Sequence, residues 1–466
     1  GALGPAPVTG AERLTFGTDY LIDPIKVVIV GLAMFAVPEI IDLLRRRVTI
    51  SESGKLGEGW LRGIRDTIKH WWIVLRCSAI GCIVGALPGL GGSVVDWIAY
   101  GHVVQTSKQR DTFGTGDIRG VIAPEAANNA KEGGALIPTI LFGIPGSGSM
   151  ALLLGGFVLI GIEPGIAIIR DTPDLVFLMI WSVGIANILG AGACMLLAPQ
   201  ISKLTTIRYV LIAPFMFGLI FFAAFQATRQ WGDLVALLVL GTFAVYMKRF
   251  GWPRPALLIG YVLSNRVEKS IYHTTATSGW SIFSQPIVIL LVAMIVLSMV
   301  AAMRYRPTQP DLAEDGTHAA KNLAPQLGFT IAVAMLAVYV VWDGMQWDRL
   351  TGIYPIVAGL VCLGFMFPIG FEMVRKKAAA TVFFDAERDT SEIAPDHRSS
   401  EYYLLWLGGM LVVSAIVGFA LGCAAFVYAF LRVRAKASHL ACAVSTAVFL
   451  IVLGFLSHFM VLTYPE

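Results

Sequence analysis

The feature that most constrains this chain is a series of apolar runs, each long enough to cross a lipid bilayer. Such runs lie at about 24–44, 175–199, 286–303 and 439–463, each with about 20 residues. In hydrocarbon the backbone must satisfy its own hydrogen bonds, so these runs form helices. Only 14% of the 466 residues are charged, against roughly 25% in soluble domains. The sequence therefore predicts an all-α, polytopic integral membrane protein with about eleven to thirteen transmembrane or re-entrant helices.

Basic residues indicate the orientation of these helices. Three arginines follow the first run at 45–47, and Arg375, Lys376 and Lys377 follow a later one. Because cytoplasmic loops are enriched in Lys and Arg, we expect residues 45–70 and 375–401 in the cytoplasm. Residues 1–23 and 343–352 would then lie on the opposite side of the membrane.

The sequence lacks the motifs of the common enzyme classes. It has no Walker A loop, no G-x-S-x-G elbow and no complete G-x-G-x-x-G. Its seven histidines are scattered singly, without metal-ligand spacing. An intramembrane enzyme would need a nucleophile–base pair or a metal cluster, and the pattern offers neither. We expect no enzyme activity, no metal, no resident cofactor and no nucleic-acid partner.

Two apolar runs are interrupted by similar Pro-Gly-x-Gly sequences. The first reads Leu-Pro-Gly-Leu-Gly-Gly-Ser at 87–93, and the second reads Ile-Pro-Gly-Ser-Gly-Ser at 144–149. Proline removes a helix hydrogen bond, glycine permits a sharp backbone turn, and serine can cap a new helix. Each interrupted helix would then direct the N-terminus of its second half at the break. The alternative is that these residues only kink and pack helices, since Gly and Pro are common in membrane helices.

Helix N-termini at two converging breaks would form a site for carboxylates. Their free N–H groups and the positive end of the helix dipole both favour an anion. Two adjacent asparagines between the breaks add amide donors and acceptors. The predicted substrate-binding residues are Pro88, Gly89, Gly91, Gly92, Ser93, Asn128, Asn129, Pro145, Gly146, Ser147, Gly148 and Ser149.

A polar stretch at 105–134 separates the two interrupted runs and is expected to lie outside lipid. It contains Glu125 and Asn128, whose oxygens suit a cation; the alternative is a solvated loop with a helix cap. Asp96 follows the first break within an apolar segment, where an ionisable group is costly. It is either a coupling-ion ligand or a first-turn carboxylate favoured by the dipole. Glu125, Asn128 and Asp96 are therefore the candidate coupling-ion residues.

These motifs, taken together, resemble the large membrane subunit of the tripartite tricarboxylate transporters. The resemblance rests on Gly-Ala-Leu-Pro-Gly-Leu-Gly-Gly at 85–92, Ala-Pro-Glu-Ala-Ala-Asn-Asn at 123–129, Gly-Gly-Ala-Leu-Ile-Pro at 133–138 and Gly-Ile-Pro-Gly-Ser-Gly at 143–148. That subunit is similar to itself in two halves, and residues 4–17 look like the segment that joins them. We therefore expect this chain to carry the second half without the first.

Residues from about 323 onward are similar, more weakly, to the small membrane subunit of the same family. This likeness rests on 347–367, with Gly-Ile-Tyr-Pro at 352–355, and on the pattern of spans. The expected domains are a permease half at 1–303, a linker at 304–325 and a small-subunit-like region at 326–466.

The resemblance implies uptake of small organic carboxylates, driven by an ion gradient, in the bacterial inner membrane. Na⁺ or H⁺ would be the coupling ion. The implied partners are a periplasmic solute-binding protein, the first half of the large permease subunit, the organic carboxylate and the bilayer. The alternative is a non-transporting structural or truncated fragment that needs a separate first-half chain.

Overall fold

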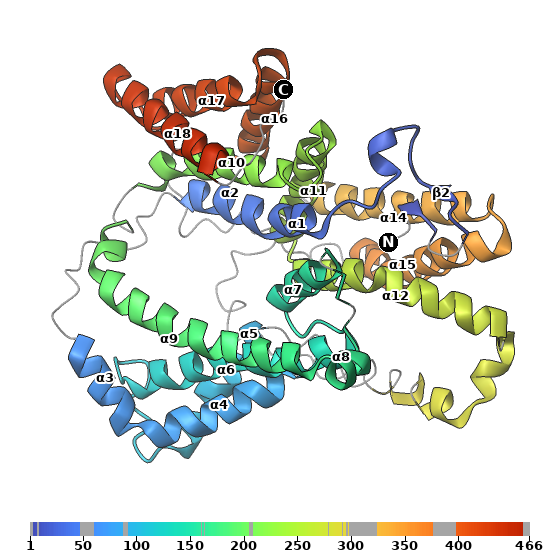
Figure 1. The fold of residues 1–466 in the computed structure, drawn as a ribbon, viewed down its shortest axis with the longest axis horizontal. Coiled ribbons are helices and arrows are strands. Elements are labelled where there is room, and N and C mark those ends of the chain that lie inside the picture. The colour runs from blue at the N-terminus through green and yellow to red at the C-terminus, as the bar shows by residue number, and fades with distance from the viewer. Residues whose placement is uncertain are drawn as a thin grey trace. The chain divides into compact units, whose positions relative to one another are not determined.

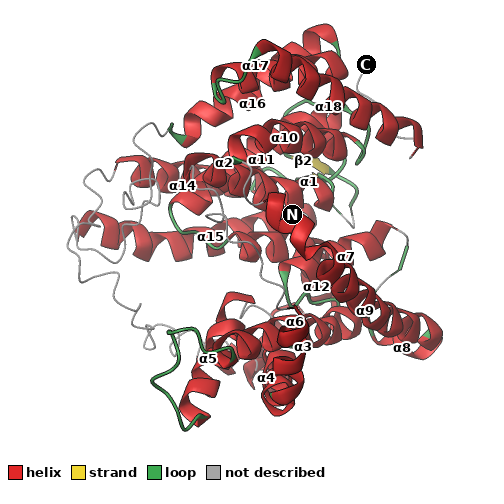
Figure 2. Cartoon of the chain, turned by 90° about the vertical axis from the view of Figure 1, so that its left-hand side faces the viewer, coloured by secondary structure: helices red, strands yellow, loops and turns green. Residues whose placement is uncertain are grey.

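The described part of the chain is almost entirely helical (Figure 2). Its only strands are the antiparallel pair β1 (Gly4–Pro5) and β2 (Glu12–Arg13). Among the described residues, seven helices are long and apolar enough to cross a membrane, which confirms the predicted all-α polytopic class. The predicted linker at 304–325 lies almost wholly outside the described residues, and the predicted crossing at 286–303 lies partly outside. The computed structural model describes residues 3–6, 9–46, 60–86, 92–159, 161–162, 164–204, 208–277, 279–290, 292–294, 297, 324–375 and 398–459.

The chain divides into two compact units that are discontinuous in sequence. Unit 1 comprises Gly1–Ile25, Tyr246–Trp252 and Leu263–Glu392, and unit 2 comprises Lys26–Val245, Pro253–Val262 and Ile393–Glu466. The region predicted to resemble the small subunit is thus shared between the units. The predicted domain boundaries at 303 and 326 rest on sequence likeness, which the contact-based units do not test, so they stay a prediction.

Unit 1 is built around a helical hairpin. The two arms are α14 (Ala324–Gly344) and α15 (Arg349–Arg375), and a short turn joins them. The turn is so tight that a β-carbon on Gly352 would overlap the carbonyl oxygen of Gly344. The unit also contains the β1–β2 pair, η1 (Asp19–Leu21), most of α12 (Arg254–Thr277) and η3 (Gly279–Ser284). Residues 255–263 form the first part of α12.

Unit 2 contains both interrupted apolar runs and most of the helices, which are labelled in Figure 1. Its first span is continuous, but it contains a π-helical turn just before Pro38, where proline cannot donate an N–H to the ladder. The elements of unit 2 are α1 (Val27–Gly31), η2 (Leu32–Ala36), α2 (Val37–Arg46), α3 (Trp60–Lys69), α4 (Trp71–Gly85), α5 (Gly92–Thr106), α6 (Arg119–Phe142), α7 (Gly148–Leu159), α8 (Ile166–Asp171), α9 (Pro173–Leu204), α10 (Tyr209–Phe225), α11 (Trp231–Arg249), α16 (Ser400–Val417), α17 (Phe419–Val433) and α18 (His439–Phe459).

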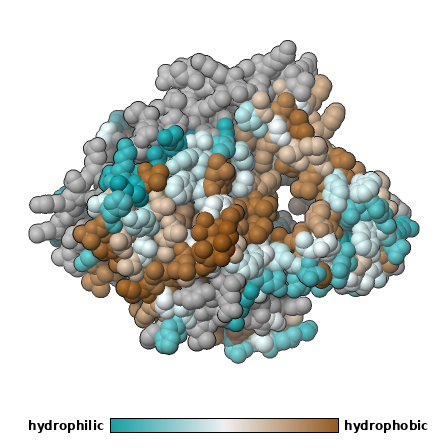
Figure 3. Space-filling model, turned by 90° about the horizontal axis from the view of Figure 1, so that it is seen from above, coloured by the Kyte–Doolittle hydropathy of each residue, from teal (hydrophilic) through white to brown (hydrophobic). Residues whose placement is uncertain are grey.

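Large apolar side chains lie openly on the surface, as a lipid-facing protein requires (Figure 3). On α9, Phe177, Trp181 and Leu196 are 62%, 68% and 78% exposed. Within the described residues, the apolar window of this helix has no buried residue. In water such a surface would be an association site, whereas in a bilayer it faces acyl chains of matching polarity.

The apolar run at 402–431 folds as a broken hairpin rather than one tilted helix. The break falls at Gly418, whose φ of +89° is strained for residues with a side chain. Beyond it, α17 packs back on α16, and a β-carbon on Gly422 would overlap the Ser414 side chain. The two glycines therefore set the turn and the close approach.

Candidate functional site

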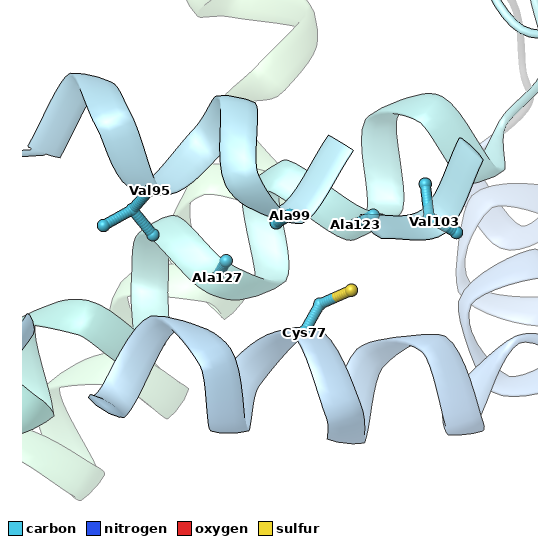
Figure 4. Packing of buried hydrophobic residues seen from close by; sticks show 6 residues of the cluster. All are labelled: Cys77, Val95, Ala99, Val103, Ala123 and Ala127. Carbon is cyan, nitrogen blue, oxygen red and sulfur yellow. The ribbon is translucent and has the colours of Figure 1, made fainter. Parts of the chain in front are cut away.

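The first break and the polar motif are held by a tightly packed group of three helices, α4, α5 and α6. Small side chains let their backbones approach closely. A β-carbon on Gly81 would overlap the carbonyl of Ala127, and one on Gly85 would overlap that of Lys131. Figure 4 shows the buried side chains of the three helices directed toward one another; these are Cys77, Val95, Ala99, Val103, Ala123 and Ala127.

Residues 119–134 of the polar stretch are helical, and their predicted location outside lipid stays a prediction. Helix α6 begins at Arg119 and continues to Phe142. Asp117 starts it by accepting the Arg119 backbone N–H at 3.0 Å. The Arg119 guanidinium also bonds to this carboxylate and holds the pKa of Asp117 well below its usual range. Ala123, Ala127 and Gly134 of this stretch pack against α4 and α5, which stabilises the helix.

The second break is a defined turn between two helices. Helix α6 ends at Phe142, and Gly143 follows in the left-handed region with φ +63°. The Ile144 backbone N–H donates to the Pro138 carbonyl at 3.2 Å, which closes the end of α6. Helix α7 begins at Gly148, and the Ser147 hydroxyl accepts the Met150 N–H at 3.2 Å. Ser147 thus caps α7, as serine does at helix N-termini.

Two polar residues that the sequence analysis did not select connect this break to α6. The buried Thr139 hydroxyl donates to the Ala135 carbonyl at 2.7 Å and accepts the Gly146 N–H at 3.4 Å. Ser147 Oγ donates to Glu132 Oε2 at 3.2 Å. Both contacts depend on the chain folding back at Gly143, so no local sequence signal identifies them.

The structure brings the second break against the end of α4, where the first break starts. A β-carbon on Gly146 would lie 2.9 Å from the Gly85 carbonyl oxygen and 2.8 Å from Ala135 Cβ. Only glycine fits this position without displacing the α4 backbone. Helix α4 ends at Gly85 and α5 begins at Gly92. The second interruption therefore lies against the C-terminal end of α4.

The predicted site residues occupy different surroundings. Pro145 and Gly146 are buried, Ser147 and Asn128 are partly buried, and Ser149, Asn129 and Glu125 are exposed. Gly92 and Ser93 start α5, and Gly148 starts α7. Asp96 is partly buried, and its Oδ1 atom lacks a hydrogen-bond partner among the described residues. Pro88, Gly89 and Gly91 lie outside the described residues. All of these assignments stay predictions.

The capping role of Ser147 can be tested against its neighbour. We expect Ser147→Ala to lower the stability of the protein by about 1 kcal/mol, since α7 loses its cap. Ser149→Ala is the matched control, because its side chain is exposed and makes no hydrogen bond among the described residues. Thermal unfolding in detergent compares the two variants. Equal midpoints would show that Ser147 does not cap α7.

Comparison with known sequences gives the relationship of the chain. Residues 1–259, more than half of its length, match the tripartite tricarboxylate transporter TctA family. The chain belongs to this family. The likeness of residues 326–466 to the small subunit is not established by this match and stays a prediction. No solved structure matches the chain.

Two relatives of this TctA-family chain come from Agrobacterium vitis. One, named "Uncharacterized 52.8 kDa protein in TAR-I ttuC' 3'region", is 30% identical over 68% of this chain. The chain covers 64% of that protein's length. The other, named "Uncharacterized protein in TAR-II ttuC' 3'region", is 32% identical over 41% of this chain and 79% of its own length.

Proposed function

We propose that this chain is the membrane component of a secondary transporter that takes up small organic carboxylates. Transport would be driven by a gradient of Na⁺ or H⁺, in the bacterial inner membrane, with substrate delivered by a periplasmic solute-binding protein. Membership of the TctA family supports a tricarboxylate transporter component. The chain itself supplies the arrangement that would bind the substrate.

The observation that carries this proposal is the contact between the second break and the end of α4. The N-terminus of α7, capped by Ser147, follows the turn that lies against Gly85 at the end of α4. Helix N-termini attract carboxylates through unpaired N–H groups and the helix dipole. Carbonyl groups at the C-terminal ends of broken helices suit a cation. One junction of broken helices therefore supplies donors for an anion and acceptors for its coupling ion.

The polar face of α6 extends this junction. Glu125, Asn128 and Glu132 are spaced three and four residues apart, so they share one side of the helix. Glu132 is bonded to Ser147 at the break. In the described part of the chain, the side chains of Glu125, Asn128 and Asn129 make no hydrogen bond. Their oxygens and amides are therefore uncommitted, and we assign them to the substrate or its cation.

Uptake measurements test the assignment of Asn129. We expect Asn129→Ala to lower the uptake of labelled citrate by about tenfold, the effect of losing one well-placed hydrogen bond to a charged group. The complete complex with its binding protein is needed, and membrane insertion should be unchanged. Asn187→Ala is the control, because Asn187 lies on α9 and bonds only to Val183 of its own helix. Full uptake at unchanged ion coupling would remove Asn129 from the site.

A second candidate function is that of a structural fragment that transports only with a separate first-half chain. The chain covers 64% of the length of the first of these relatives, which motivates this alternative. Expression with and without a first-half chain distinguishes the two. Uptake by this chain together with the binding protein alone would contradict the fragment hypothesis.

A further inference from the structure

Unit 1 contains a buried arginine, Arg13, with two N–H donor atoms that have no hydrogen-bond partner among the described residues. Arg13, on β2, is 1% exposed. Its Nη1 atom lies 2.6 Å from Glu268 Oε1 on α12 and donates to the Thr351 carbonyl on α15 at 2.9 Å. Its Nε and Nη2 atoms are buried and have no hydrogen-bond partner among the described residues. One side of the guanidinium is therefore fully engaged and the other side is not.

The unused side has the geometry of a carboxylate receptor. The Nε–H and Nη2–H bonds of arginine run parallel, and together they bind both oxygens of a carboxylate. Buried donors are almost always satisfied in folded proteins, so a pair of orphaned N–H groups calls for an acceptor. Glu268 does not supply it, because its carboxylate contacts the guanidinium at Nη1.

The backbone around Arg13 is strained in a way that favours a functional role. Leu14 and Phe16 have φ values of +54° and +49°, in the left-handed region that residues with a side chain rarely adopt. Strain of this kind persists at sites where the surrounding structure holds a side chain in place. Here the Phe16 ring stacks on Tyr339 of α14, with centroids 5.8 Å apart. Arg13 is thus fixed on both sides of its position in the chain.

The predicted topology places this site on the side of the membrane opposite the cytoplasm. Arg13 bonds to the Thr351 carbonyl, and the Thr9 hydroxyl bonds to that of Thr351 at 2.8 Å, so the N-terminal hairpin and the start of α15 lie side by side. The positive-inside rule predicts both segments on the side opposite the cytoplasm.

We propose that the Nε–Nη2 edge of Arg13 binds the carboxylate of a soluble organic acid at an external site separate from the helix breaks. The proposal relies on the proposed function only for the choice of citrate as the probe. Binding would place two carboxylates on one guanidinium, and the Glu268 charge would then repel the incoming anion. This repulsion gives the proposal a prediction with a definite sign.

Citrate titration of the full chain in detergent, by calorimetry, tests the site. We expect Glu268→Gln to tighten citrate binding on the order of tenfold, because a like charge is removed from a buried site. Arg13→Lys should weaken it about tenfold, since lysine keeps the charge but lacks the planar pair of donors. The double variant Arg13→Gln with Glu268→Gln should lose the site while keeping a neutral, hydrogen-bonded pair. Unchanged or weaker binding in Glu268→Gln would overturn the proposal and leave Arg13 as the structural partner of Glu268.

Two further measurements separate this site from others. Asn129→Ala should not change citrate binding at Arg13. If the Arg13 variants leave citrate binding unchanged while Asn129→Ala lowers uptake, the Arg13 proposal has failed and the proposed function has not. Stabilisation of the wild type by phosphatidylglycerol, with no response to citrate, would identify a lipid phosphate as the anion and would overturn the soluble-acid proposal.

Discussion

Replacing Gly134 by alanine is expected to destabilise the core of unit 2 more than any conservative change on α6. A β-carbon at this position would overlap the backbone carbonyl group of Cys82 on α4. Backbone atoms of a packed helix cannot rotate away, so α4 and α6 must separate. Overpacking of this kind costs about 1–3 kcal/mol. We expect a lower unfolding midpoint in detergent and a loss of uptake, because the Gly85 end of α4 moves away from Gly146.

Gly133→Ala provides a matched control one residue away. A β-carbon on Gly133 would meet no atom within 4 Å. Alanine is favoured over glycine in a helix by about 1 kcal/mol, so this variant should be as stable as the wild type or more stable. If both variants behaved alike, the close approach of α4 and α6 would be wrong, and the contact of Gly146 with the end of α4 would be in question with it.

The positions of the two breaks could be predicted from sequence because their causes are local. Proline and glycine stop a helix wherever they occur in this order, and α6 and α7 do end and begin on either side of residues 143–147. The partners of the break could not be predicted. Thr139 and Glu132 reach Gly146 and Ser147 only after the chain has folded back. Nothing in their immediate sequence distinguishes them from an ordinary helix threonine and a surface glutamate.

The extent of α6 could not be predicted from the polarity of its first half. Its first half carries Glu125, Lys131 and two asparagines, and such polarity favours a loop outside the membrane. Alanine and glycine on the other side of the same helix pack against α4 and α5, which stabilises the helix. The average polarity of the stretch does not show that its polar and its small residues lie on different sides of one helix. Arg13 is a similar case, since a lone arginine in a polar segment gives no sign that it will be 1% exposed.

The contact between α10 and α18 gives the second large expected effect. Phe449 of α18 is 1% exposed, and its ring lies 5.8 Å from that of Phe215 on α10. Phe449→Ala would leave a cavity between these helices and should cost about 3–5 kcal/mol of stability. Phe455→Ala on the same helix is the control, because Phe455 is 58% exposed and its removal leaves no cavity. Thermal unfolding of the purified chain in detergent measures both.

Gly218 makes this prediction specific to the contact. A β-carbon on Gly218 would lie 2.5 Å from the Phe449 ring, so Gly218→Ala alone should be destabilising. In the Phe449→Ala background the ring is gone, and the same β-carbon fills part of the cavity. The two changes should therefore be non-additive, with the double variant more stable than the sum of the single effects predicts. Residue 449 lies beyond the family match at 1–259 and Gly218 lies within it. Additive effects would mean that Phe449 of α18 does not pack on Gly218 of α10.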